Sequence, residues 1–215
     1  MSSDRRLINH WNEYYKKDGI PLYPSPFAKY ISNQLNEEQN ILEIGCGNGR
    51  DTNFFATQGH NVTGIDKSTE AIDLCKKLYS EECVEFFLGT ITDLAKKNQK
   101  KYDLVYSRFV IHAMSLDEEI KTLKMSYKLL KNNGKFFIEC RSINDPLSEC
   151  GEIVSQTERI DGHYRRFIIL EEFKQRLTQI GFKIVAAIES KGLAKFAEED
   201  PVIIRVSAIK DSLSN

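Results

Sequence analysis

Residues 41–50 read Ile-Leu-Glu-Ile-Gly-Cys-Gly-Asn-Gly-Arg, an apolar run that opens onto three alternating glycines. A second apolar run, at residues 61–65, ends at Asp66. A glycine loop allows backbone N–H groups to approach a ligand closely, because no Cβ is in the way. An acidic side chain at the end of the next strand can accept two hydrogen bonds from a ribose diol. The two features together predict a nucleoside-binding βαβ unit.

Apolar runs and helical patterns alternate along the rest of the chain. The expected strands are residues 40–44, 62–65, 84–88, 102–106, 135–140, 182–188 and 202–209. The expected helices are residues 6–17, 27–36 and 170–180, one after Gly49, one after Ser68 and one from the capping box 115–118 to the closing residues 132–134. This order predicts the α/β class: a three-layer sandwich around a Rossmann-like, seven-stranded, mostly parallel sheet with an antiparallel edge strand.

The composition argues against several classes of protein. A chain of 215 residues with 41% apolar residues has enough apolar material for one core. A net charge of -1 argues against a generally basic nucleic-acid-binding surface. The polar N-terminal residues predict no secretory signal, and no apolar run approaches the ~18 residues needed to span a bilayer. Five cysteines without Cys-x-x-Cys spacing predict reduced thiols, no metal site and a cytoplasmic location.

The spacing of the glycines narrows the choice of nucleoside. A dehydrogenase loop reads Gly-x-Gly-x-x-Gly, and Arg50 stands where its third glycine is expected. The pattern fits Glu-x-Gly-x-Gly-x-Gly instead. With Asp66, the segment 102–107 and the lead-in 129–134, the chain resembles the class I S-adenosylmethionine (SAM) dependent methyltransferases over residues 40–210. The resemblance implies their fold and SAM as the cofactor, and a nicotinamide-dependent oxidoreductase is the alternative.

The resemblance also implies where the cofactor is held. Glu43 is expected to orient the methionyl amine, Asp66 to hold the ribose hydroxyls, and Lys67 to lie beside the adenosine. Thr90 and Ile91 are expected to flank the adenine, although many family members have Asp where Thr90 stands. The full set of expected cofactor residues is Glu43, Gly45, Cys46, Gly47, Gly49, Asp66, Lys67, Thr90, Ile91 and Ser107. The alternative interpretation is an ordinary tight turn between a strand and a helix, with Asp66 as a solvated acid.

The loop after the fourth predicted strand bears on the acceptor. Adenine amino-methyltransferases usually carry Asn/Asp-Pro-Pro-Tyr there, whereas residues 107–110 read Ser-Arg-Phe-Val. A Pro-Cys nucleophile for pyrimidine C5 chemistry is absent from the sequence as well. A small molecule is therefore favoured over a nucleic acid. His112, further along this loop, is either a general base or a histidine used for capping and packing.

Basic residues after the fifth predicted strand suggest the charge of the acceptor. Arg141 ends that strand, and the segment 161–167 reads Asp-Gly-His-Tyr-Arg-Arg-Phe. Arginine forks bind carboxylate or phosphate bidentately, so convergence of these side chains over the sulfonium would favour an anionic acceptor. The alternative is that they pair with nearby acidic residues on a solvated surface. The catalytic candidates are His112, His163 and Arg141, and the acceptor-binding candidates are Tyr15, Tyr23, Arg108, Arg141, His163, Tyr164, Arg165 and Arg166.

The N-terminal aromatic residues suggest the division of the chain. In related small-molecule methyltransferases an N-terminal helix covers the cofactor and excludes water. Residues 1–39 are therefore expected to form a helical lid, although packing of these aromatics against the first helix is the alternative. Residues 40–215 are expected to form the SAM-binding domain, with a substrate insertion at about 142–169.

A narrower resemblance is carried by the segments Arg-Ser-Ile-Asn-Asp-Pro-Leu, at 141–147, and 161–167. They resemble methyltransferases of bacterial capsule and surface-polysaccharide gene clusters, some of which act in O-methyl phosphoramidate biosynthesis. This resemblance implies O-methylation of a small anionic acceptor, phosphoryl or nucleotide-linked. The alternatives are methylation of another small metabolite or sugar, and a SAM-binding protein without catalysis. No nucleic-acid or membrane partner is expected, and the choice between a monomer and a homodimer is open.

Overall fold

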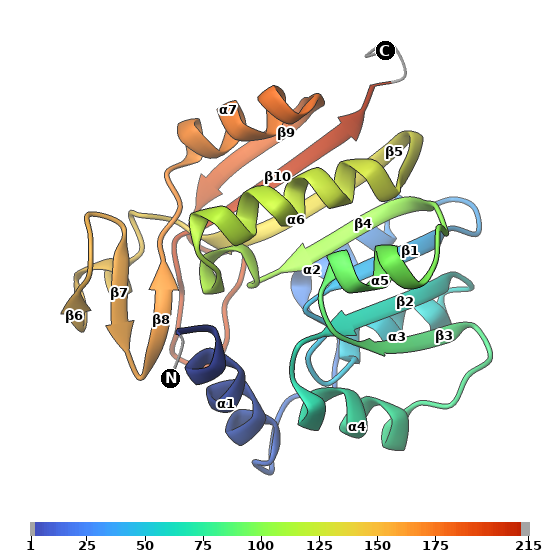
Figure 1. The fold of residues 1–215 in the computed structure, drawn as a ribbon, viewed down its shortest axis with the longest axis horizontal. Helices are drawn as coiled ribbons and strands as arrows, with labels where there is room; N and C mark the ends of the chain where they lie inside the picture. Colours follow the sequence, from blue (N-terminus) through green and yellow to red (C-terminus); the bar gives the residue numbers. More distant parts are fainter. Residues whose placement is uncertain (1–2, 212–215) are drawn as a thin grey trace.

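The computed structural model describes residues 3–211, in which seven strands form one sheet in the order β3-β2-β1-β4-β5-β10-β9 (Figure 1). Their bounds are β1 (Asn40–Ile44), β2 (Asn61–Asp66), β3 (Val84–Leu88), β4 (Tyr102–Arg108), β5 (Leu130–Arg141), β9 (Phe182–Ser190) and β10 (Ile203–Lys210). β1 to β5 are parallel, and β10 pairs antiparallel with both β5 and β9. The predicted fold class is therefore confirmed, and β10 is its antiparallel strand, next to β9 at the edge.

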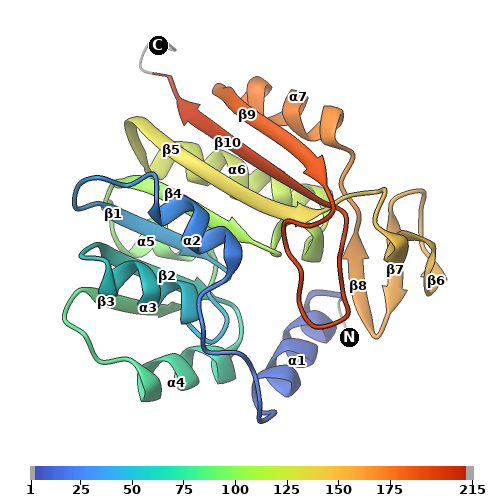
Figure 2. The ribbon, with the colours of Figure 1, turned by 180° about the vertical axis from the view of Figure 1, so that it is seen from behind.

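Helices cover both faces of this sheet. α2 (Pro26–Ser32) and α3 (Arg50–Thr57) pack apolar residues on one face, seen in Figure 2. α5 (Ile91–Lys97), α6 (Leu116–Leu129) and α7 (Leu170–Ile180) bury apolar residues in the larger core on the other face. α4 (Thr69–Leu78) begins at its predicted N-cap, Ser68, whose Oγ accepts a hydrogen bond from the Ala71 N–H. α1 (Ser3–Tyr15) lies beyond the carboxyl ends of the parallel strands (Figure 1).

The junction between α6 and β5 differs from the prediction. Residues 132–134 were expected to close the helix, with the strand starting at 135. Instead α6 ends at Leu129 and β5 begins at Leu130, which pairs with Tyr102 of β4. Leu130 is buried, so the chain turns into the sheet at once, and Asn133 takes a φ of 60° within the early part of the strand.

The insertion at 142–169 contains a second sheet, which the sequence did not predict. After the short 3-10 helix η2 (Pro146–Glu149), three antiparallel strands follow: β6 (Glu152–Ile153), β7 (Glu158–Asp161) and β8 (His163–Arg166). Strands of two to four residues are too short to give a clear alternation of apolar and polar residues. β8 lies beside α1 at the carboxyl end of the main sheet (Figure 1). None of the helices among residues 3–211 combines the length and apolar character of a bilayer-spanning helix.

Candidate active site

A cavity of about 700 Å³ lies at the carboxyl ends of β1, β2 and β4. Ligands of open parallel sheets bind at this edge, where strand order reverses. The glycine loop after β1, Asp66 and Arg108 all line this cavity. α1 contributes Trp11 and Tyr15 to its wall. The cavity therefore joins the predicted cofactor loop to residues that come from distant parts of the chain.

Hydrogen bonds fold the glycine loop back onto the end of β2. The N–H groups of Gly45 and Cys46 both donate to the Ile65 carbonyl oxygen, at 2.7 and 2.9 Å. Gly47 has a φ of 55°, and a Cβ built on it would lie 2.2 Å from the Tyr15 Oη. Only glycine fits between this backbone and the tyrosine. The loop thus presents bare backbone to the cavity, as the approach of a ligand requires.

Asp66 connects the glycine loop to the start of α4 through two hydrogen bonds. Its Oδ2 accepts from the Gly47 N–H at 3.0 Å, and its Oδ1 accepts from the Ser68 N–H at 2.8 Å. Burial raises the pKa of this carboxyl above its usual value, while these backbone hydrogen bonds and Lys67 act in the opposite direction. Each carboxylate oxygen has two lone pairs, so both can still accept from a ribose diol.

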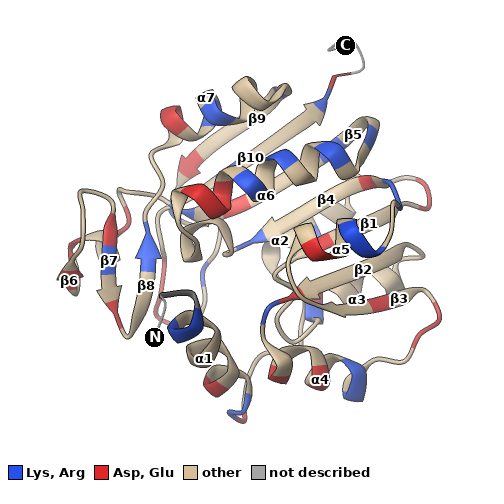
Figure 3. Cartoon of the chain, in the orientation of Figure 1, with Lys and Arg blue, Asp and Glu red and all other residues tan. Residues whose placement is uncertain are grey.

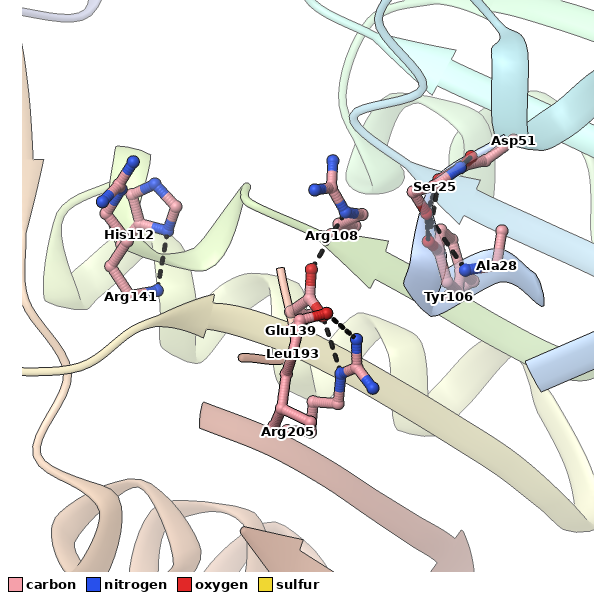
Figure 4. A network of polar contacts seen from close by, with 10 residues as sticks. All are labelled: Ser25, Ala28, Asp51, Tyr106, Arg108, His112, Glu139, Arg141, Leu193 and Arg205. Atoms are coloured by element: carbon pink, nitrogen blue, oxygen red, sulfur yellow. Dashed lines mark hydrogen bonds and ion pairs between the residues drawn. The ribbon is translucent and has the colours of Figure 1, made fainter. Parts of the chain in front are cut away.

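Glu43 and Asp51 form a buried acidic pair beside the loop. Glu43 accepts a hydrogen bond from the Thr52 hydroxyl, and burial, with Asp51 nearby, raises the pKa of Glu43 well above its usual value. Asp51 accepts from the N–H and Oγ of Ser25, each at 2.7 Å, and from the Tyr106 Oη at 2.8 Å (Figure 4). Asp51 therefore ties the start of α2 to the start of α3. Neither Ser25 nor Asp51 was predicted from the sequence to belong to the site.

The expected adenine-binding residues are placed at the start of α5. The Thr90 hydroxyl caps this helix and lies 2.6 Å from the Asp93 Oδ2, so it is already engaged in a capping box. Ile91 is buried and lines the cavity. Lys67 lines it too and pairs with Glu118 at 2.7 Å. Ser107 is buried and its Oγ has no hydrogen-bond partner among the residues that the structure describes.

Arg108 lies at the end of β4 and is held by a shared carboxylate. Its Nε donates to the Glu139 Oε1 at 2.9 Å, and the Arg205 Nε donates to the Glu139 Oε2 at 2.7 Å (Figure 4). The guanidinium of Arg108 also lies over the Phe109 ring, 4.4 Å from its centroid. The Glu139 carboxylate is thus shared by two arginines, and only the Nε of Arg108 is used in this contact.

The structure assigns specific partners to Arg141 and His112. The Arg141 guanidinium pairs with Asp145 at 3.1 Å and with Glu199 at 3.2 Å. The backbone N–H of Arg141 donates to the His112 Nδ1 at 3.2 Å, as Figure 4 shows. This bond selects the tautomer of neutral His112 that carries its hydrogen on Nε2. Burial, then Arg141, lowers the pKa of His112 well below its usual value. In this arrangement neither nitrogen offers a free lone pair to an acceptor proton.

The candidates on β8 face two different neighbours. His163 stacks on His10 of α1 with ring centroids 4.3 Å apart, and the Arg165 Nη1 donates to the Asp161 carbonyl oxygen at 3.0 Å. Arg166 points the other way and pairs with the buried Glu119 of α6. Figure 3 shows basic β8 and the acidic first turn of α6 on the same side of the molecule.

The predicted convergence of basic side chains is therefore only partly present. Among the acceptor and catalytic candidates, the residues that line the cavity are Tyr15, Tyr23, Arg108 and Arg141. Those outside its lining are His112, His163, Tyr164, Arg165 and Arg166. Tyr164 instead donates to the Glu158 Oε1 at 2.5 Å. Two of the expected cofactor residues, Gly49 and Ser107, also lie outside the lining.

Comparison with known proteins identifies the domain. A family model described as a methyltransferase domain matches residues 41–134. Phosphoethanolamine N-methyltransferase of Plasmodium falciparum (isolate 3D7) is 26% identical over 205 residues, which are 87% of this chain and 74% of that protein. Malonyl-[acyl-carrier protein] O-methyltransferase of Priestia megaterium is 34% identical over 138 residues, which are 60% of this chain and 47% of that protein. Residues 41–134 of this chain thus match a methyltransferase domain.

Solved methyltransferases share the fold of this domain. A SAM-dependent methyltransferase of Methanosarcina mazei superposes with a TM-score of 0.68 at 20% identity, over 85% of this chain and 97% of that one. The 1,6-didemethyltoxoflavin-N1-methyltransferase of Burkholderia thailandensis, with bound S-adenosylhomocysteine (SAH), gives 0.66 at 20% identity, over 86% and 77%. The SAH bound to this neighbour supports SAM as the predicted cofactor. The chain spans three quarters of the length of the first relative above and about half that of the second.

The methyltransferase cavity has one wall that the sequence analysis missed. The connection between β9 and β10 lines it with Ala194, Lys195, Phe196, Glu199 and Pro201. The sequence predicted a longer hairpin connection here and no site residue within it. Its length, about 13 residues, was the one available signal, because tight hairpins use two to five residues.

Proposed function

We propose that this methyltransferase transfers the methyl group of SAM to a small anionic acceptor, phosphoryl or nucleotide-linked. The leading case is O-methylation of a precursor in surface polysaccharide biosynthesis, such as a phosphoramidate. The observation that carries the anionic acceptor is Arg108, whose terminal nitrogens have no protein partner among residues 3–211.

The residues around the glycine loop suit the cofactor. Bound SAM supplies an electrophilic methyl carbon on a positively charged sulfur, and leaves as SAH when the carbon–sulfur bond breaks. The backbone of Gly45 and Gly47 would hold its methionine and ribose part, and Asp66 its ribose hydroxyls. A Cβ at Gly47 would clash with the Tyr15 hydroxyl, so the glycine loop and Tyr15 in their present positions require glycine at this residue. Thr90 is engaged in helix capping, which leaves Ile91 to pack on the adenine.

Arg108 is preorganised to bind an anion. Its side chain is 14% exposed, and its Nε is fixed on Glu139, which also pairs with Arg205. The Nη1 and Nη2 groups of such a fork match two oxygens of a phosphate or carboxylate. Arg141, by contrast, is neutralised by Asp145 and Glu199. An anionic acceptor at Arg108 would compensate both this guanidinium and the positively charged sulfur of the cofactor.

The name of one relative is consistent with a phosphoryl acceptor and gives a second candidate. Phosphoethanolamine N-methyltransferase, by its name, acts on an amine that carries a phosphate ester. N-methylation of a phosphoryl amine is therefore the second candidate for this chain. The two candidates differ in their need for a base: an oxygen that is already anionic needs none, whereas an ammonium must first lose a proton. The tautomer of His112 favours the oxygen, since its Nδ1 is already engaged.

The remaining assignments belong to the same proposal. α1 acts as a lid, because Trp11, Tyr14 and Tyr15 line the cavity from above the glycine loop. The reaction takes place in the cytoplasm, consistent with five free cysteines among residues 3–211. The partner is the small acceptor, with no nucleic acid and no membrane. A homodimer is compatible with this reaction, because the described cavity is complete within one chain.

A transfer assay with labelled SAM tests the proposal. The acceptors are ethyl phosphate, a phosphoramidate, phosphoethanolamine and their neutral analogues. We expect transfer to anionic acceptors, and Arg108→Met should lower kcat/KM by about 10- to 100-fold if a charge-assisted pair is lost. Lys96→Met makes the same change in net charge on the exposed outer face of α5 and should have no effect. Equal transfer to neutral analogues, or full activity of Arg108→Met, would contradict the proposal.

A further inference from the structure

We propose that the connection between β9 and β10, residues 191–202, forms the outer wall of the acceptor site and selects acceptors that carry a flat apolar group beside their anionic group. This inference rests on the proposed function and deepens it. Phe196 is the residue that makes the selection. Its ring lines the cavity and half of its surface, 50%, is exposed.

The connection lies where an acceptor must enter. Figure 2 shows it extending from the ends of β9 and β10 toward α1 and β8, at the carboxyl end of the sheet. Lys195 and Phe196 line the same cavity as Arg108, the glycine loop and Asp66. An acceptor held by Arg108 would therefore lie in the cavity that this connection helps to enclose.

The wall is fixed in place at several points. The Arg205 Nη2 donates to the Leu193 carbonyl oxygen at 2.8 Å, and the Gly192 N–H donates to the Asp200 Oδ1 at 2.7 Å. Glu199 pairs with Arg141 at 3.2 Å. A wall that is already ordered loses little conformational entropy when a ligand binds.

The tip of the connection is a tight turn that presents Phe196. The N–H groups of Phe196 and Glu199 donate to each other's carbonyl oxygens, at 3.0 and 2.9 Å. Ala197 between them has a φ of 49°, a left-handed conformation that is unfavourable for alanine. Such a backbone persists only where the surrounding contacts determine it. The turn thus fixes the backbone that carries Phe196 at the cavity.

The same arginine anchors both parts of the acceptor site. Arg205 bonds the Leu193 carbonyl oxygen of the connection and the Glu139 carboxylate that orients Arg108 (Figure 4). The cationic fork and the aromatic ring are therefore fixed to one framework. A ligand with an anionic group and a flat ring would engage both, since aromatic rings stack with one another.

Calorimetry with two phosphate monoesters tests the selection. Ethyl phosphate and phenyl phosphate are titrated into the full chain saturated with SAH, so that neither ester competes for the adenosine site. We expect wild-type protein to bind phenyl phosphate more tightly. Phe196→Ala should weaken phenyl phosphate about 3- to 10-fold, the range of an aromatic pair, and leave ethyl phosphate unchanged. Phe196→Tyr keeps a ring and should keep the preference.

A matched control lies in the same hairpin. Ile188 of β9 is also 50% exposed and does not line the cavity, so Ile188→Ala should change neither affinity. If Phe196→Ala leaves the preference for phenyl phosphate intact, or wild-type protein shows none, the selecting role of this wall is overturned. If Arg108→Met binds both esters as wild-type protein does, the proposed function itself fails, whatever Phe196 does.

Discussion

Asp66 shows how one side chain joins the two halves of the cofactor corner. It accepts N–H groups from the glycine loop and from the start of α4, through Gly47 and Ser68. Replacing it with alanine removes these acceptors and the one expected for the ribose. We predict that Asp66→Ala weakens SAH binding by ~1–3 kcal/mol, measured by calorimetry. Asp103→Ala, which removes a carboxylate that accepts the Asn40 N–H at 2.9 Å and does not line the cavity, is the control. Unchanged affinity in Asp66→Ala would contradict the assigned role.

His163 gives the protein a specific dependence on pH. Burial, then Arg165 and His10, lowers the pKa of His163 from 6.5 to about 3. Between these two values the unfolded chain binds a proton that the folded chain does not, so the free energy of unfolding decreases as pH falls from 6.5 toward 3. We predict that His163→Phe, which keeps a ring against His10 and removes the titration, flattens this decrease. Urea unfolding at pH 7 and pH 5 measures it, and an unchanged slope would contradict the prediction.

The residues of the two halves of the site differed in how well the sequence predicted them. The cofactor half follows from local spacing: Gly45, Gly47 and Asp66 stand where two strands end, and a parallel sheet brings such ends together. The acceptor half depends on contacts between distant segments. Arg108 and Arg166 are both arginines in candidate loops, and only the three-dimensional contact with Glu119 gives Arg166 a buried ion pair. No spacing rule contains that information.

At the scale of the element, β8 directs alternate side chains to opposite sides. His163 contacts α1, whereas Arg166 pairs with Glu119, which also pairs with Arg176 of α7 at 2.5 Å. Removing Arg166 leaves Arg176 as the remaining partner of the buried Glu119 carboxylate, and it also removes the Arg166 side chain from a buried position. We predict that Arg166→Ala lowers the free energy of unfolding by about 3 kcal/mol, whereas Arg165→Ala, on the opposite side, changes it by less than about 1 kcal/mol. Denaturant unfolding measures both, and equal effects would contradict the structural assignment.

Most elements of the main sheet were predictable from the sequence, because each strand is a buried apolar run with a turn signal after it. β1 and β3 have the predicted bounds, the capping box 115–118 marks the start of α6, and Gly181 marks the end of α7. The exceptions have physical causes. β5 starts early because buried Leu130 pairs with Tyr102, and polar residues follow it within the strand. The strands of the insertion depend on each other and on α1, so no local pattern predicts them.

At the scale of the whole molecule, α1 connects three otherwise separate parts. The Ser68 Oγ donates to the Asn12 Oδ1 at 2.7 Å, which joins α1 to the start of α4. The stack of His10 on His163 joins it to the insertion. The Tyr15 hydroxyl lies against Gly47 of the cofactor loop. A ligand in the cavity would therefore lie under a helix that depends on contacts with the loop, the insertion and α4 at once.

This arrangement predicts that cofactor binding and the order of α1 are coupled. A helix held by a few polar and aromatic contacts opens more easily than the sheet core, and its backbone amides exchange hydrogen accordingly. SAH beneath α1 would add contacts with its aromatic face, so we predict slower amide exchange in residues 3–15 when SAH is bound.

Asn12→Ala, which removes the bond to Ser68, should speed exchange in α1 and reduce the protection that SAH gives. α7 lines no part of the cavity and should exchange equally with and without SAH. Mass spectrometry of exchanged peptides measures both segments. If α1 exchanges hydrogen equally with and without SAH, its contacts serve only to pack the helix on the protein. Residues 1–39 would then not act as a lid.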